Sequence, residues 1–217
     1  MDFNFKGAIN RFYHRVNIYR RFLHWSKQGV IFIHVPKAAG TSINKAIYGR
    51  TLGHYTINEI ERAFPRLVEK SFVFTICRNP YDRLVSAYHF AKAGRTKDMG
   101  MRNPKQYQIP EFDTFHSFVT EWLENKDITL LDNVFRPQYL YVSSNGKLNV
   151  DFLGHVETLA KDMEIVSQKL GKTIHVGHSN AVVREKSFRD YYTPELQRIV
   201  MDLYEKDFRL LGYSFEI

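Results

Sequence analysis

Apolar residues form short uninterrupted runs at several points of the chain, and segments with helical spacing separate them. Strand-like runs lie at 31–35, 71–77 and 150–156, with a weaker one at 173–176. Runs of this length, rich in β-branched and aromatic residues, are typical of buried strands in a parallel sheet. The alternation predicts a three-layer α/β/α fold, in which helices cover both faces of a central parallel sheet.

Helical features occupy the intervals between these runs. Apolar residues recur every three or four positions near the N-terminus, Pro80 stands where proline favours a helix start, and Gly171 follows the last position of another helical pattern. The predicted helices are 3–25, 58–64, from 80 onward, 112–125, 157–170 and from 191 onward.

The first predicted helix is basic as well as amphipathic. Residues 1–30 contain six lysines and arginines against one acidic residue, within a chain whose formal net charge is +8. Such a helix either packs against the domain or lies on an anionic membrane surface. We therefore predict a basic helical arm at 1–27 and a single domain at 28–217. Nucleic acid is not an expected partner, because no recognition motif accompanies the charge.

The cysteine count and the lengths of the apolar runs bear on the compartment. Cys77 is the only cysteine, which excludes an intramolecular disulfide and suits a reducing compartment. No apolar run has the length of a membrane span or of a signal-peptide core. We expect a cytoplasmic protein, with peripheral membrane contact through residues 1–27 as an addition to this location.

The most informative stretch follows the first predicted strand. Residues 36–42 read Pro-Lys-Ala-Ala-Gly-Thr-Ser and lead into a helical segment. Three small residues let the backbone approach a ligand, Thr41 or Ser42 can cap the helix, and the free amides of a helix N-terminus bind anions. Lys37 adds positive charge to the same turn. The stretch predicts a phosphate-binding loop, with an ordinary capped turn as the alternative.

The order of residues in this loop separates it from the nucleotide-triphosphatase pattern. That pattern ends in Gly-Lys-Ser/Thr, whereas here Lys37 opens the loop and Gly40 precedes Thr41. A P-loop kinase is therefore the weaker hypothesis, also because no metal-holding aspartate follows a strand. The loop resembles the 5′-phosphosulfate loop of sulfotransferases that use 3′-phosphoadenosine 5′-phosphosulfate (PAPS).

A second motif follows the second predicted strand. Arg-Asn-Pro at 78–80 precedes Arg-Leu-Val-Ser at 83–86. This run resembles the 3′-phosphate motif of carbohydrate sulfotransferases, the wider family that includes the heparan and uronyl 2-O-sulfotransferases. The resemblance implies that Arg78 and Ser86 hold the 3′-phosphate of PAPS, and a guanidinium does offer forked donors to a phosphate. Similarity to this family extends over about residues 30–215.

The resemblance implies an enzyme with a P-loop-like fold and a defined co-substrate. Such an enzyme transfers a sulfuryl group from PAPS to a hydroxyl of a saccharide, glycolipid or polysaccharide and releases 3′-phosphoadenosine 5′-phosphate (PAP). It implies that Lys37 neutralises the leaving phosphate, while Ala39, Gly40, Thr41 and Ser42 hold the 5′-phosphosulfate. The reaction needs no metal, and the sequence has no metal-ligand motif. A non-catalytic anion- or membrane-binding protein is the alternative.

The catalytic base has three candidates. His54 follows Gly53, and uronyl 2-O-sulfotransferases have a Gly-His in the corresponding interval, which implies His54 as the base. Histidine titrates near neutrality, as a general base should. Glu59 and Glu61 are the alternatives, because other branches of the family use glutamate. His34, on the first predicted strand, is expected to be structural.

Overall fold

A parallel sheet of three strands lies at the centre of the protein. The computed structural model describes residues 13–95, 100–101, 103–177 and 186–217. The strands β1 (Val30–Ile33), β2 (Phe72–Cys77) and β5 (Phe152–His155) have the order β1-β2-β5, so that β2 pairs with both neighbours. This confirms the α/β class, the parallel sheet and three of the predicted strands.

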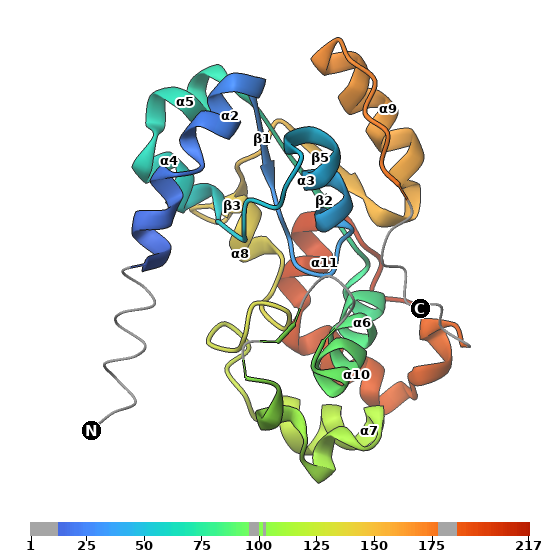
Figure 1. Ribbon diagram of the computed structural model, residues 1–217. Coiled ribbons are helices and arrows are strands. Elements are labelled where there is room, and N and C mark those ends of the chain that lie inside the picture. The colour runs from blue at the N-terminus through green and yellow to red at the C-terminus, as the bar shows by residue number, and fades with distance from the viewer. Residues whose placement is uncertain (1–12, 96–99, 102, 178–185) are drawn as a thin grey trace.

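Helices surround the sheet (Figure 1). In the figure, α2, α4 and α5 lie beside β1, whereas α6, α7 and α10 form a group below the sheet. The α-helices are α2 (Phe22–Gln28), α3 (Gly40–Tyr48), α4 (Ile57–Ala63), α5 (Pro65–Lys70), α6 (Pro80–Ala93), α7 (Phe115–Ser117), α8 (Tyr139–Val142), α9 (Leu159–Leu170), α10 (Pro194–Leu203) and α11 (Glu205–Leu211).

Shorter elements connect these helices. The 3-10 helices are η1 (Pro104–Tyr107), η2 (Pro110–Phe112), η4 (Val156–Thr158) and η5 (Phe188–Tyr191), η3 (Phe118–Leu123) is a π-helix, and β3 (Ser143–Ser144) pairs antiparallel with β4 (Lys147–Leu148).

Two hydrophobic clusters stabilise the fold. The first, which we call the sheet core, combines strand residues such as Ile31 and Phe74 with Ile43 of α3 and Trp25 of α2. The second, which we call the aromatic core, joins α6, η2, η3, α10 and α11. Its fully buried side chains include Tyr81, Phe112, Phe118, Phe135, Tyr204 and Phe208.

Local sequence explains where the helices that border the site begin. Asn79 accepts hydrogen bonds from the first amides of α6, and Pro80 occupies the first helical position, where a missing N–H costs little. Thr56 and Glu59 form a reciprocal capping box at the start of α4. Both helix starts therefore follow from short polar motifs.

Three of the predicted elements were wrong in detail. Residues 173–176 do not form a strand, because the amide of Ile174 donates to the side chain of Ser167 on α9 instead of pairing with the sheet. The predicted helix at 112–125 is divided among η2, α7 and η3. The aromatic side chains of Phe112, Phe118 and Trp122 pack against one another there, and the amide of Glu124 reaches back five residues to Val119.

The predicted N-terminal helix is not continuous. Residues 13–19 are helical, residues 20 and 21 form a turn, and α2 follows; residues 3–12 lie outside the described part of the chain. Arg21 at the turn donates to the carbonyl of Leu52, and Trp25 is buried in the sheet core, so tertiary contacts redirect the chain. The boundary between an arm at 1–27 and a domain at 28–217 stays a prediction. Among the described residues, no helix has the length and apolar character needed to cross a membrane.

Candidate functional site

The loop between β1 and α3 has an unusual backbone. Lys37 and Ala39 both have positive φ angles, 67° and 58°, in the left-handed region that L-residues rarely adopt. Ala39 directly precedes α3, whose first turn contains Thr41 and Ser42. Non-glycine residues in this region store strain that surrounding contacts must maintain, and such strain is common at ligand sites. The predicted phosphate-binding loop is therefore a tightly constrained turn into a helix.

Gly40 is required by the close approach of a histidine. A Cβ atom added at Gly40 would lie 1.9 Å from Cδ2 of His34, so the imidazole lies directly against the loop. His34 is buried, and its Nδ1 has no hydrogen-bond partner among the described residues. Burial, followed by the neighbouring charge of His54, lowers the pKa of His34 well below its ordinary value. The ring is therefore neutral near pH 7 and packs as part of the loop.

The two predicted nucleotide motifs meet in space. Nη1 of Arg78 donates to the carbonyl oxygen of Lys37 at 3.3 Å, and Nε donates to Oδ2 of Asp82 at 2.7 Å. They meet because β1 and β2 are adjacent and parallel, so the segments that follow them start from the same edge of the sheet. Ser86 lies half-buried on α6, and no hydrogen bond between described residues joins it to Arg78.

The side chain of Lys37 extends over α6. Its Nζ lies 4.2 Å from the centroid of the Phe90 ring, a cation–π contact. Phe90 and Ser86 are one turn apart on α6, so they lie on the same side of this helix. The lysine and the serine predicted for the nucleotide site are thereby brought to one helix face.

His54 is held in the tautomer that a general base needs. Its Nδ1 lies 3.0 Å from the carbonyl oxygen of His34, and a carbonyl can only accept, so Nδ1 carries the proton. Nε2 of the neutral ring is then an acceptor. The His34 and His54 rings pack with centroids 4.1 Å apart, which fixes the orientation of the imidazole.

The surroundings of His54 favour its neutral form. Burial is the main cause that lowers its pKa below the ordinary value; the hydrogen bond to His34 opposes this effect, and the charges of Arg83 and His14 add to it. A half-buried imidazole beside the loop can therefore accept a proton at neutral pH.

The two glutamates that were alternatives to His54 have structural partners. Glu59 accepts from Nε2 of His14 at 3.1 Å and from the amide and hydroxyl of Thr56. Burial raises the pKa of Glu59, but the hydrogen bonds from His14 and Thr56 outweigh it, so the pKa lies below the ordinary value. Glu61 accepts from Asn149 at 3.2 Å. Both carboxylates thus connect α4 to its neighbours.

Arg83 is the first of three buried residues that sequence reasoning missed. It is only 1% exposed and donates from Nε to the carbonyl of Pro36 at 3.0 Å and from Nη2 to the carbonyls of Val134 and Arg136. It therefore attaches the start of the loop to the segment before α8. The sequence did contain one indication of this role: Arg83 is a charged residue among the apolar positions of α6 that face the core.

Gln138 and Asp207 support Arg78 from behind. The side-chain amide of Gln138 accepts from the Arg78 N–H at 3.0 Å and donates to the Arg78 carbonyl at 2.7 Å. Asp207 in turn accepts from the amides of Gln138 and Tyr139, both at 2.8 Å. Gln138 and Asp207 are fully buried, and burial raises the pKa of Asp207 to about 6. No local pattern in the sequence indicates these contacts.

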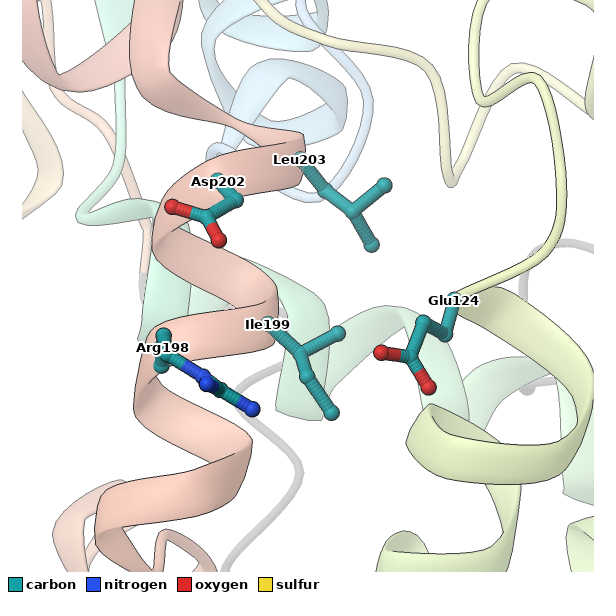
Figure 2. A pocket seen from close by; sticks show the side chains of 5 residues that line it. All are labelled: Glu124, Arg198, Ile199, Asp202 and Leu203. Carbon is teal, nitrogen blue, oxygen red and sulfur yellow. The ribbon is translucent and has the colours of Figure 1, made fainter.

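A pocket of about 290 Å³ lies elsewhere, between α10 and the end of η3 (Figure 2). Its lining contains none of the predicted site residues. The described residues contain no cluster of three or more histidine, cysteine, aspartate or glutamate side chains that could bind a metal ion. The pocket is lined by Glu124, Arg198, Ile199, Asp202 and Leu203.

Comparison with known proteins identifies the family of the chain. A model of the sulfotransferase family matches residues 20–214. The chain belongs to the sulfotransferase family. It is also similar to an uncharacterized protein of Archaeoglobus fulgidus, with 30% identity over 110 residues that cover 51% of this chain and 76% of that protein. No solved structure matches this sulfotransferase. Its family membership supports sulfuryl transfer as the general chemistry.

Proposed function

We propose that this sulfotransferase transfers a sulfuryl group from PAPS to a hydroxyl group of a saccharide, glycolipid or polysaccharide. The contact between Arg78 and the Lys37 carbonyl, at 3.3 Å, supports this proposal most directly. It brings together the two motifs that resemble the 5′-phosphosulfate and 3′-phosphate sites of the family. A single nucleotide with phosphates at both positions could contact both motifs.

The donor groups on the loop fit such a nucleotide. Lys37 and Arg78 supply positive charge, and α3 begins at Gly40, so its first amides point toward the loop. When bound, PAPS supplies an activated sulfuryl group, and we assign its 5′-phosphosulfate to residues 39–42.

Two further roles follow from the nature of the side chains. Arg78 and Ser86 hold the 3′-phosphate, because a guanidinium and a hydroxyl both donate to phosphate oxygens. Lys37 stabilises the negative charge that develops on the departing 5′-phosphate. Its cation–π contact with Phe90 holds the ammonium near α6. This contact is worth only about 0.5–2 kcal/mol, so the ammonium can leave the ring to reach the phosphate.

His54 is the proposed base for the acceptor. Its Nε2 takes the hydroxyl proton while the new bond forms between sulfur and the acceptor oxygen. The bond between sulfur and the 5′-phosphate oxygen breaks, and PAP leaves with the electron pair. The Nδ1 hydrogen bond to His34 keeps Nε2 unprotonated before the reaction, and Glu59 and Glu61 have other partners. These contacts favour His54 over either glutamate.

Calorimetric titration with PAP, AMP and Mg-ATP tests the nucleotide assignment. PAP and AMP differ only in the 3′-phosphate, and each charge-assisted hydrogen bond contributes about 1.5–3 kcal/mol. We therefore expect PAP to bind at least about tenfold more tightly than AMP. Arg78→Ala should remove most of this difference, whereas Arg50→Ala, at an exposed position after α3, should not.

Each alternative has its own result in this titration. Equal affinity for PAP and AMP would contradict the 3′-phosphate assignment. Tight binding of Mg-ATP with weak binding of PAP would indicate a kinase. Failure to bind any of the three nucleotides would indicate a non-catalytic anion- or membrane-binding protein.

A further inference from the structure

Exposed apolar side chains are concentrated in one short stretch. Among the described residues, eight large hydrophobic side chains are exposed, and five of these lie between positions 13 and 23. Leu23, at 73% exposed, is the most exposed of the five. We call these five residues, together with the exposed basic side chains of Arg15, Arg20 and Lys27, the arm surface. The apolar members are Tyr13, Val16, Tyr19, Phe22 and Leu23.

The opposite side of the same helices is firmly packed on the domain. Ile18 and Trp25 are buried in the sheet core, and the His14 ring stacks on Tyr55 at 4.4 Å. An α-helix advances about 100° per residue, so Val16 and Ile18 point in nearly opposite directions. The exposed apolar face is therefore held in a fixed orientation and is not a consequence of a loosely attached segment.

Exposed basic side chains lie within this stretch of the chain and on the helices that it contacts. Arg15, Arg20 and Lys27 are all exposed, and Arg62 and Arg66 are exposed on α4 and α5, which contact the arm through Phe64. Residues 1–70 contain 12 lysines and arginines against 4 acidic residues, whereas residues 71–217 contain 19 of each. The whole net charge of the chain thus belongs to the part that carries the arm surface.

We propose that the arm surface binds an anionic lipid bilayer. A helix lies on a membrane surface when its apolar side chains enter the headgroup region and its basic side chains contact anionic lipids. Tyrosine suits this boundary because its ring is apolar and its hydroxyl is polar. A second copy of the chain would instead bring the same positive charges together. The inference does not depend on the proposed sulfuryl transfer.

Flotation of the full chain with lipid vesicles tests this surface. Vesicles of phosphatidylglycerol and phosphatidylcholine should bind the protein, vesicles of phosphatidylcholine alone should not, and about 0.5 M salt should release it because the Debye length becomes short. The triple variant Arg15→Gln, Arg20→Gln, Lys27→Gln should bind about 100-fold more weakly, since each basic residue contributes about 1 kcal/mol, a factor of about five. Its matched control is Lys105→Gln, Lys126→Gln, Lys161→Gln, at exposed positions elsewhere.

An apolar substitution tests the other half of the proposal. Leu23→Ser should weaken binding to the anionic vesicles about tenfold. Leu130→Ser is the matched control, because Leu130 is 77% exposed but lies outside the arm surface. Circular dichroism of each variant verifies that it is folded before it is compared.

Several results would overturn the proposal. These are absence of binding to anionic vesicles, equal binding to uncharged vesicles, or an equal loss in the control variants. Sedimentation that shows a dimer abolished by Leu23→Ser, without vesicle binding, would assign the surface to a second copy. PAP titration of the same samples separates the two proposals. Vesicle binding without PAP binding would support membrane binding by the arm surface and contradict the proposed sulfuryl transfer from PAPS.

Discussion

The two cores of the molecule differ in composition and in what they support. In the described residues, nine of the 19 buried side chains of the aromatic core are aromatic, against six of 25 in the sheet core. The sheet core ends at the loop that carries Lys37 and at the strand end that carries Arg78. The aromatic core fills the space behind α6, the helix that carries Ser86 and Phe90. One core therefore positions the proposed nucleotide-binding residues Lys37 and Arg78, and the other fixes α6, the helix against which Lys37 lies.

Buried polar side chains connect the two cores. Arg83 joins α6 to the loop, and Gln138 and Asp207 join α8 and α11 to the backbone of Arg78. Polar groups of this kind are costly to bury unless every one is paired. We therefore expect substitutions to have three separable effects: on turnover at the loop, on stability in the aromatic core, and on both at the polar contacts between them.

The largest effect should come from His54. His54→Asn keeps a donor for the His34 carbonyl but removes the proposed base, so turnover should fall about 10²–10⁴-fold while PAP affinity stays nearly unchanged. The acidic limb of the wild-type pH profile, which reports protonation of this imidazole below pH 6.5, should also disappear. The measurement is the initial rate of sulfuryl transfer as a function of pH.

Glu59→Gln and Glu61→Gln are the controls for His54. Both keep the shape of the side chain, and both should retain most of the activity. A nearly inactive glutamate variant beside an active His54→Asn would place the base on a carboxylate and contradict the structural role given to that residue.

Lys37→Ala should have the second largest effect. Charge on the departing phosphate grows mainly in the transition state, so kcat should fall about 10²–10³-fold and the Kd for PAP should change much less. Lys45→Ala, at an exposed position of the adjacent helix α3, is the control. Normal kcat with a raised KM would mean that Lys37 only binds substrate.

Phe118→Ala should affect stability instead of turnover. The ring is fully buried and packs on Phe112 at a centroid distance of 4.9 Å. Its removal should lower the free energy of unfolding by about 3–5 kcal/mol. Urea denaturation measures this loss, and kcat below the unfolding transition should stay near the wild-type value. A large loss of kcat in folded protein would show that the two cores do not act separately.

Gln138→Leu should have both effects, each of moderate size. It leaves the N–H and carbonyl of Arg78 without their partner, so the free energy of unfolding should fall by about 1–3 kcal/mol. PAP affinity should fall about tenfold because Arg78 is less well oriented, whereas AMP affinity should change little. Titration of folded protein with both nucleotides tests this, and an equal loss for the two would indicate a general defect of the fold.

The smallest effect should be a pH dependence of stability on the sheet side. The pKa values of His34 and His54 are lowered, mainly by burial, so the folded chain excludes protons that the unfolded chain binds below about pH 6.5. Their contribution to the free energy of unfolding therefore decreases as pH falls. Asp207 acts in the opposite sense, because its raised pKa, about 6, favours the folded state at low pH.

Comparison of two proteins isolates the histidine contribution. Urea midpoints of wild type and His54→Asn should converge as pH is lowered from 7.5 to 5.5, because only the wild type loses the stability linked to that imidazole. A constant difference across this range would mean that protonation of His54 does not differ between the folded and unfolded chains.

Patterns within short segments determined a large part of this structure. The apolar runs before Pro36 and Arg78, the small residues of the loop and the proline at position 80 each have a local physical meaning, and the strands and helix starts follow from them. Two of the three wrong predictions have causes nearby in the sequence: the amide of Ile174 donates to the side chain of Ser167 instead of pairing with the sheet, and aromatic packing around Phe118 overrides regular helical spacing. The third, the continuous N-terminal helix, fails because of the tertiary contacts of Arg21 and Trp25.

Tertiary structure alone decided what surrounds the site. Gln138 contacts Arg78 from 60 residues away, Asp207 contacts Gln138 from 69 residues away, and the His34 carbonyl fixes the tautomer of His54 across 20 residues. A sequence pattern reports the period of one element and the conformations its residues allow. Which buried polar groups pair depends on how the two cores pack and bring distant segments together, and this is why the loop could be predicted and its supports could not.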